Sequence, residues 1–207
     1  MPITEKLWDS NYKLAELSLN TKFVQGLKSG NLPKHIFQEY LAQDYFFLET
    51  FAKAYGLAVS KSKDKYSIRT LSQLLIGVSE ELILHENYAE EWDIDLSNNH
   101  IKPATKNYTD FLDDVSKKLS AVEIMFAMTP CMRLYSWIGQ RLSNMGYDNT
   151  YKEWIITYSD KNFENLAKSL ENLIDSYQDS FDINHANYLY KRAMELELDF
   201  FKAYSDF

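Results

Sequence analysis

Cysteine, glycine and proline are all scarce in this chain of 207 residues, which has one cysteine, six glycines and four prolines. A single cysteine excludes an intramolecular disulfide, so cysteine usage gives no sign of an oxidising compartment. Sheet-rich folds need many turn residues, and the shortage of glycine and proline therefore favours long helices with few connections.

Long apolar runs and clusters of positive charge are also missing. No run approaches the roughly 20 apolar residues that span a bilayer, and residues 1–6 open on charges, unlike a signal peptide. The net charge of −8 argues against nucleic acid or an anionic membrane as a partner, because both reward clustered Lys and Arg. We therefore expect a cytoplasmic protein.

Aromatic residues, in contrast, are plentiful at 15%, with 15 tyrosines and 12 phenylalanines. So many tyrosines indicate either buried hydroxyls that need partners or an aromatic-lined pocket. The length fits one domain with a substantial core, so we predict a single domain over residues 1–207.

The hydrophobic pattern is helical throughout, and we find no alternating run long enough to predict a strand. Polar stretches at 95–106 and 146–149 are predicted to be connections, and the spacing of Ser120 and Glu123 is that of a capping box. The sequence thus predicts an all-α helical bundle. Its predicted helices cover 3–28 with a break near Asn20, 33–60, 66–93, 104–119, 120–145, two segments that begin near 150 and 160, and 183–204.

Two carboxylates occupy positions where a helix should be apolar. The residues three, four and seven places from Asp44 are all apolar or aromatic, and nearly the same holds for Glu197. Burying an unpaired charge costs several kcal/mol, so an inward acid needs a partner or a purpose. A structural partner such as Arg133 or a tyrosine hydroxyl remains an alternative for each acid.

Cys131 lies in a third apolar stripe of this kind. The segment from Ile124 to Met132 contains no charged residue. A lone cysteine on an apolar face is often an inert part of the core. Two inward acids and an inward thiol together indicate a site, provided that their helices face one another.

Histidine offers little support for a metal site. The four histidines, His35, His85, His100 and His185, are widely separated. Glu81 and His85 are spaced i, i+4, but one such pair supplies at most two ligands, and no second pair accompanies it. This argues against a di-iron bundle. Gly-rich phosphate loops and dinucleotide-binding fingerprints are absent as well.

These positions belong to a longer pattern that resembles the TenA/thiaminase II family along nearly the whole chain. Each stretch alone is weak, and the specificity comes from their order and spacing. The stretches are Phe23, Leu27, Gly30, Leu32 and Phe37, followed by Tyr40-Leu41-Ala42-Gln43-Asp44 and Phe47-Leu48; Pro130-Cys131-Met132-Arg133-Leu134-Tyr135; Tyr151, Trp154-Ile155 and Tyr158-Ser159; and Glu197-Leu198-Asp199-Phe200-Phe201.

The resemblance implies a bundle of the haem-oxygenase-like type, a homotetramer, and no metal or organic cofactor. It implies hydrolysis of 4-amino-5-aminomethyl-2-methylpyrimidine to the hydroxymethyl compound with ammonia release, a thiamin-salvage step, and some members also cleave thiamin. The family's nucleophile falls on Cys131 and its catalytic acid on Glu197. Its pyrimidine-binding positions fall on Asp44, Phe47, Tyr108, Tyr135 and Tyr158.

The chain departs from the family pattern at a few positions, and other functions stay open. Phe47 stands where we expect tyrosine, and Phe201 where we expect tryptophan. From the residues alone, Tyr108 and Tyr158 fit helix packing as well as ligand contact. One alternative is another oxidase on a haem-oxygenase-like scaffold, although no histidine precedes His35. Another is a non-catalytic pyrimidine-binding or regulatory protein, which would release no ammonia.

Overall fold

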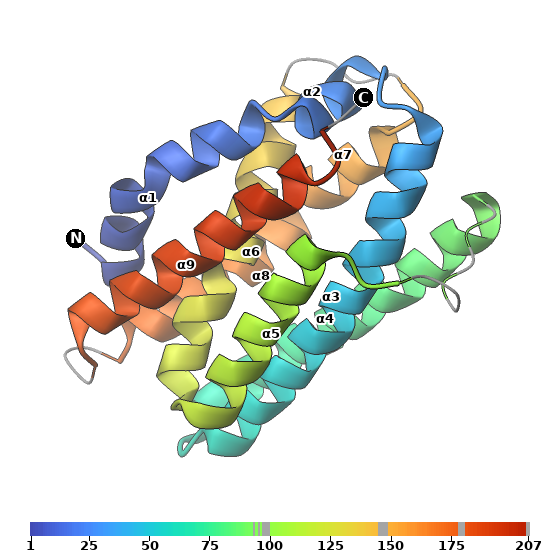
Figure 1. Cartoon of the computed structure of the whole chain (residues 1–207). Coiled ribbons are helices and arrows are strands. Elements are labelled where there is room, and N and C mark those ends of the chain that lie inside the picture. Colours follow the sequence, from blue (N-terminus) through green and yellow to red (C-terminus); the bar gives the residue numbers. More distant parts are fainter. Residues whose placement is uncertain (93, 95, 97–99, 145–148, 178–180, 206–207) are drawn as a thin grey trace. The chain divides into compact units, whose positions relative to one another are not determined.

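Every regular element in the described part of the chain is a helix (Figure 1), which confirms the predicted all-α class. The computed structural model describes residues 1–92, 94, 96, 100–144, 149–177 and 181–205. The helices are α1 Ile3–Leu19, α2 Lys22–Ser29, α3 Lys34–Lys61, α4 Lys65–Trp92, α5 Pro103–Lys118, α6 Ala121–Ser143, α7 Lys152–Ser159, α8 Lys161–Asp175 and α9 Ile183–Lys202.

The helix boundaries fall where the sequence places stop and start signals. The predicted break near Asn20 separates α1 from α2, and the hydroxyl of Thr21 caps α2 by accepting from the Val24 amide. Gly30 then ends α2 in the left-handed conformation, with φ of 74°, which glycine adopts without steric cost. At the start of α6 the Ser120 amide donates to the Glu123 carboxylate, as in the predicted capping box. The predicted turn at 146–149 lies mostly outside the described residues.

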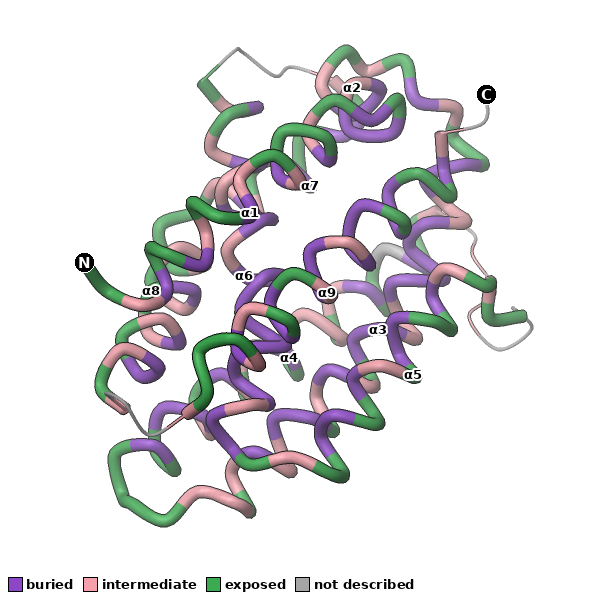
Figure 2. The backbone as a smooth tube through the Cα atoms, turned by 60° about the vertical axis from the view of Figure 1, so that its left-hand side comes forward, coloured by how far each residue is buried: buried purple, intermediate pink, exposed green. Residues whose placement is uncertain are grey.

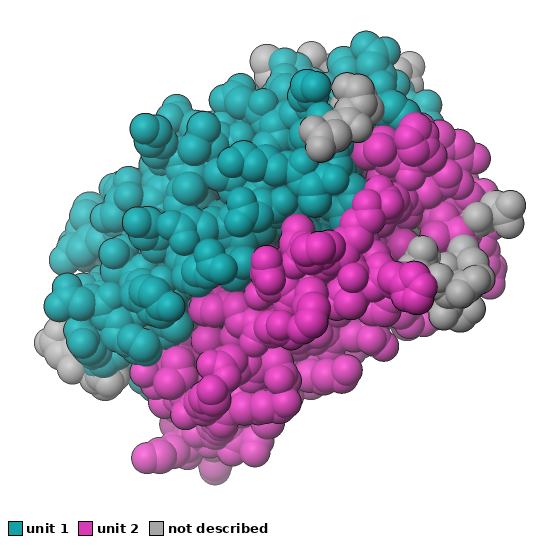
Figure 3. Space-filling view, viewed as in Figure 1, with its two compact units in different colours: residues 1–33, 126–207 teal, residues 34–125 magenta. Residues whose placement is uncertain are grey.

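The helices group into two compact units, coloured separately in Figure 3. Unit 2 is one continuous segment, residues 34–125, in which α3 packs against both α4 and α5. Buried positions follow α3 along most of its length (Figure 2), as expected for a helix with neighbours on two sides. These positions include Asp44 and Phe47.

Unit 1 combines residues 1–33 with residues 126–207. Within it α1 packs along α9 and also contacts α8, while α2 contacts α9 and α7 contacts α8. Its core includes residues from both segments, such as Phe23 and Phe201, whose rings stack. Among the described helices, none combines the length and the apolar character that a membrane crossing requires.

Candidate active site

Asp44 is buried in unit 2, as the apolar stripe of α3 predicts, with 3% of its surface exposed. Its histidine partner was not predicted. The Oδ2 atom lies 2.8 Å from Nε2 of His85 on α4, and the Tyr40 hydroxyl donates to the same oxygen at 3.4 Å. A tyrosine hydroxyl is one of the two partners that the sequence left open for this acid. Both bonds to Asp44 reach one carboxylate oxygen.

His85 is itself buried, with 4% of its surface exposed. Its second ring nitrogen, Nδ1, lies 3.0 Å from the main-chain oxygen of Glu81. Burial lowers the pKa of His85, but the hydrogen bond and charge of Asp44, aided by the charge of Glu81, raise that pKa to about 8. The i, i+4 spacing of Glu81 and His85 therefore reflects a main-chain hydrogen bond. The described residues contain no group of three His, Cys, Asp or Glu side chains arranged to hold a metal ion.

Two of the predicted pyrimidine-binding residues meet beside Asp44. Phe47 lies one turn further along α3, and its ring packs against that of Tyr108 on α5, with ring centroids 4.6 Å apart. The Phe47 ring also stacks on Phe51, with centroids 5.2 Å apart. Both Phe47 and Tyr108 are buried, so unit 2 combines one carboxylate with an aromatic surface.

Gln43, next to Asp44, holds the segment that leads into α5. Its side-chain amide donates to the His100 carbonyl at 2.9 Å and accepts from the Lys102 amide at 2.7 Å. Gln43 is buried with 2% of its surface exposed, so these bonds satisfy an amide that would otherwise be costly to bury. Through them α3 fixes the start of the helix that carries Tyr108.

The second group of predicted residues lies in unit 1. Cys131 is buried on α6 with 8% of its surface exposed, and Tyr135 is one turn later on the same face. The Tyr135 ring meets that of Tyr158 on α7, edge to face, with centroids 4.8 Å apart. Trp154 adjoins both rings. Gly139, one turn beyond Tyr135, has no side chain to hold the α7 main chain away.

Glu197 is buried on α9, with 1% of its surface exposed. Phe201 lies one turn later, and its ring packs against Tyr135 with centroids 5.3 Å apart. The two rings that meet each lie one turn beyond a predicted catalytic residue, Cys131 on α6 and Glu197 on α9. The burial predicted for Cys131 and Glu197 is therefore confirmed.

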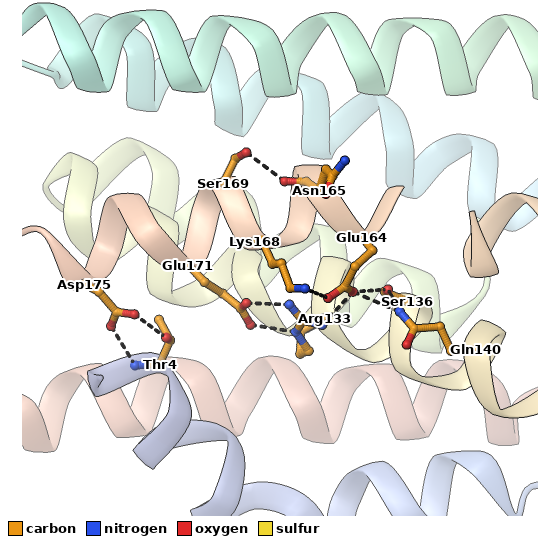
Figure 4. A network of polar contacts seen from close by, with 10 residues as sticks. All are labelled: Thr4, Arg133, Ser136, Gln140, Glu164, Asn165, Lys168, Ser169, Glu171 and Asp175. Carbon is orange, nitrogen blue, oxygen red and sulfur yellow. Dashed lines mark hydrogen bonds and ion pairs between the residues drawn. The ribbon is translucent and has the colours of Figure 1, made fainter. Parts of the chain in front are cut away.

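Arg133 does not serve as the structural partner of either inward acid. Its guanidinium donates to Glu171 through Nε at 2.7 Å and to Glu164 through Nη1 at 2.8 Å, both on α8. Figure 4 shows Arg133 between these two carboxylates, with Ser136 also donating to Glu164 at 2.6 Å. This network joins α6 to α8, and Arg133 pairs with the two α8 carboxylates.

The predicted site residues therefore fall into two sets. Unit 2 contains Asp44, Phe47 and Tyr108, and His85 is the residue of this set that sequence reasoning missed. Unit 1 contains the other members, which are Cys131, Tyr135, Tyr158 and Glu197. Unit 2 thus supplies a carboxylate and an aromatic surface on which a flat heterocycle can stack, and unit 1 supplies a thiol, a carboxylate and further aromatic rings.

Comparison with protein families gives one match, to the TENA/THI-4/PQQC family, over residues 12–206. A curated relative, the mitochondrial bifunctional TH2 protein of Arabidopsis thaliana, is 32% identical over 96% of this chain, which spans only 36% of that protein's length. The aminopyrimidine aminohydrolase of Halalkalibacterium halodurans is 31% identical, with 84% of this chain aligned to 81% of that protein.

Solved structures show the same arrangement of helices. A protein described as a TenA family transcription regulator, from Silicibacter sp. TM1040, matches with a TM-score of 0.92 and 25% identity, over 99% of this chain and 96% of that one. Haem oxygenase-1 of Synechocystis sp. PCC6803 matches with a TM-score of 0.63 and 14% identity, over 98% of this chain and 92% of that one. The predicted haem-oxygenase-like fold is thereby confirmed.

Proposed function

Since this chain belongs to the TENA/THI-4/PQQC family, we propose that it hydrolyses 4-amino-5-aminomethyl-2-methylpyrimidine to the 5-hydroxymethyl compound and ammonia. Support comes from the relative named aminopyrimidine aminohydrolase, with 31% identity over most of both chains. The reaction is a thiamin-salvage step. Cleavage of thiamin at the same carbon, with thiazole as the leaving group, is the related activity that we expect to accompany it.

Cys131 is the proposed nucleophile, and Glu197 the proposed acid and base. The Cys131 sulfur bonds to ring carbon C6 while Glu197 gives a proton to ring nitrogen N1. The aminomethyl group, protonated as an ammonium, then leaves as ammonia while electrons of the 4-amino group shift through C4 and C5 to form an exocyclic C5=CH2 bond. Water adds to the methylene carbon and gives one proton to solvent. Glu197 takes back the N1 proton, and the C–S bond breaks to release the product and the thiolate. Covalent addition thus divides one difficult displacement into easier steps.

Asp44 is the proposed binding group for the pyrimidine, because a carboxylate accepts hydrogen bonds from an exocyclic amine. Phe47, Tyr108, Tyr135 and Tyr158 are the proposed aromatic residues against which the flat ring stacks. None of these steps calls for a metal ion or an organic cofactor.

The observation that supports this proposal is the ring contact between Tyr135 on α6 and Phe201 on α9, each one turn beyond a buried candidate residue, Cys131 or Glu197. The chain's one cysteine is buried. Arg133, one of the structural partners considered for the acid, is bound to Glu164 and Glu171 instead.

Ammonia release from a panel of aminopyrimidines and thiamin tests the proposal. The wild-type chain should release ammonia from the 5-aminomethyl compound, and Cys131→Ser should stop turnover while it still binds the pyrimidine. Turnover by Cys131→Ser close to that of the wild type would contradict the role of the thiol. Binding without any ammonia release by the wild type would instead identify a regulatory or carrier protein.

We further propose a homotetramer, a single functional domain and a cytoplasmic location. The family match over residues 12–206 runs through both compact units, which supports one domain over 1–207. Ile76 and Ile83, two turns apart on α4, are each 58% exposed, which supports a contact with another copy. Light scattering after size exclusion measures the mass, and Ile76→Asp should dissociate the assembly if α4 forms that contact.

A further inference from the structure

The hydrogen bonds around His85 fix how many protons it shares with Asp44. A carbonyl oxygen only accepts, so Nδ1, 3.0 Å from the Glu81 oxygen, must carry a hydrogen. The other nitrogen, Nε2, lies 2.8 Å from Asp44 Oδ2. Two acceptor atoms do not approach so closely without a proton between them. One proton is therefore held between the imidazole and the carboxylate.

The surroundings decide on which partner this proton resides. The titratable groups that act on His85 in the described residues are Asp44 from α3, to which the Tyr40 hydroxyl donates, and Glu81 from its own helix. Both carboxylates favour a cationic ring, and the pKa of His85 is raised to about 8 despite the burial. At neutral pH the pair is an imidazolium and a carboxylate with no net charge.

The same contacts leave the second oxygen of Asp44 open to a ligand. His85 and Tyr40 both bond to Oδ2, and Oδ1 makes no hydrogen bond to any residue in the described part of the chain. A carboxylate kept ionised has acceptors only, so Oδ1 can pair with an amine but not with a carbonyl.

We propose that His85 is a positioning residue which keeps Asp44 ionised, so that the site selects pyrimidines with an amino group over those with an oxo group at position 4. This inference rests on the proposed function, since it assigns Asp44 to the exocyclic amine. Without the imidazolium, a buried carboxylate would take up a proton and could then donate to a 4-oxo group. Selectivity would fall because the site had gained a donor.

His85→Gln separates the charge from the hydrogen bond, since its amide can still donate to Asp44 but cannot become cationic. We would measure dissociation constants for 4-amino-5-aminomethyl-2-methylpyrimidine and its 4-oxo analogue by calorimetry, in the full-length Cys131→Ser chain, where the ligand is not consumed. With His85 present, the site should bind the amine about 100-fold more tightly or better, because binding of the 4-oxo analogue would leave a charged acceptor unpaired. His85→Gln should reduce this ratio by about 10-fold, the size of one hydrogen bond to a charged group.

A control variant and a second measurement keep the inference testable if His85→Gln is unstable. His35→Gln, a matched change of an exposed histidine on α3, should leave the ratio unchanged. NMR titration of the imidazole carbons in the ligand-free chain, which does not depend on any activity, should give His85 a midpoint near 8, and Asp44→Asn should lower it.

An unchanged amine-to-oxo ratio in a folded His85→Gln chain, or a wild-type His85 midpoint at or below 6.5, would overturn the role of His85. Absence of ammonia release from the wild type would overturn the proposed function instead. In active enzyme, His85→Gln should raise KM for the amine more than it lowers kcat, since the lost interaction is one of binding.

Discussion

Gly139 on α6 lies so close to Tyr158 on α7 that a Cβ at position 139 would stand 2.4 Å from the Tyr158 carbonyl carbon. A main-chain atom cannot rotate aside as a flexible side chain can. The Tyr135 ring, one helical turn away on α6, meets the Tyr158 ring across the same helix pair. The missing side chain at Gly139 is thus what allows the two tyrosines to meet.

Gly139→Ala should push α7 away from α6 and destabilise the chain by about 1–3 kcal/mol, the usual cost of overpacking. It should also raise KM for the aminopyrimidine, because Tyr158 moves with α7. Urea unfolding and steady-state kinetics measure the two effects. Gly56→Ala is the matched control. In the described part of the chain, no atom beyond its neighbours and its own helix backbone lies within 4 Å of its Cβ position on α3, so this change should stabilise the chain by about 0.5–1 kcal/mol.

Arg133→Met should destabilise the chain by about 3 kcal/mol, because it leaves the partly buried Glu171 without its cation and Glu164 with only the more exposed Lys168. Arg141→Met on the same helix is the control, since Arg141 is exposed and lies over the Trp137 ring. Its loss should cost less than about 1 kcal/mol. Equal losses in the two variants by urea unfolding would contradict a structural role specific to the Arg133 network.

Acid should weaken the wild-type chain partly through Glu164. Burial raises the pKa of Glu164, but hydrogen bonds from Ser136 and Lys168 and the charge of Arg133 hold it below its ordinary 4.5. A lowered folded-state pKa gives stability that is present above pH 4.5 and is lost as pH falls through the folded-state value. Unfolding free energy measured from pH 6 to pH 3 should therefore fall less steeply in Arg133→Met than in the wild type.

The pair of His85 and Asp44 should make stability depend on pH in the opposite direction. The pKa of His85 rises from 6.5 to about 8 on folding, so its contribution is complete below pH 6.5 and is lost as pH rises through 8. Between pH 6 and pH 9 the wild type should lose about 1–2 kcal/mol that His85→Gln does not lose. Urea unfolding at both pH values gives this difference, and parallel curves for the two proteins would argue against it.

Lys61, the last residue of α3, should stabilise the end of α5. Its ammonium donates to the carbonyls of Ser116 and Leu119 at 2.7 and 2.6 Å, and to Lys117 at 3.1 Å. Lys61→Met should cost about 1–2 kcal/mol, because these carbonyls at a helix end lose a cationic donor. Hydrogen exchange should quicken at the end of α5. Lys117→Met, which removes only an exposed pair with Asp113, should cost about 0.5 kcal/mol or less.

Sequence patterns predicted the helices well because each boundary has a local cause. The break between α1 and α2, the stop at Gly30 and the start of α6 all follow from residues within one turn of the boundary. The inward placement of Asp44, Cys131 and Glu197 was equally accessible, since it depends on spacing within one helix.

The partner of Asp44 was not predicted, because spacing within a helix does not show which helix it faces. His85 is 41 residues away in sequence. A signal for it did exist, since Val78 and Ala89, seven places before and four after, are buried with it. In the test applied to Asp44, five of the six positions around His85 are apolar or aromatic, and only Glu81 is charged. The i, i+4 spacing of Glu81 and His85 instead suggested a pair of metal ligands.

The division of unit 1 into residues 1–33 and 126–207 has a consequence for synthesis on the ribosome. The partners of α3 are α4 and α5, and all three have been made once residue 118 is complete. In contrast, α1 packs along α9, which ends at Lys202. The side of α1 that packs against α9 therefore stays uncovered until residue 202 has been translated, and a chaperone that recognises nascent chains would have a long time to bind there.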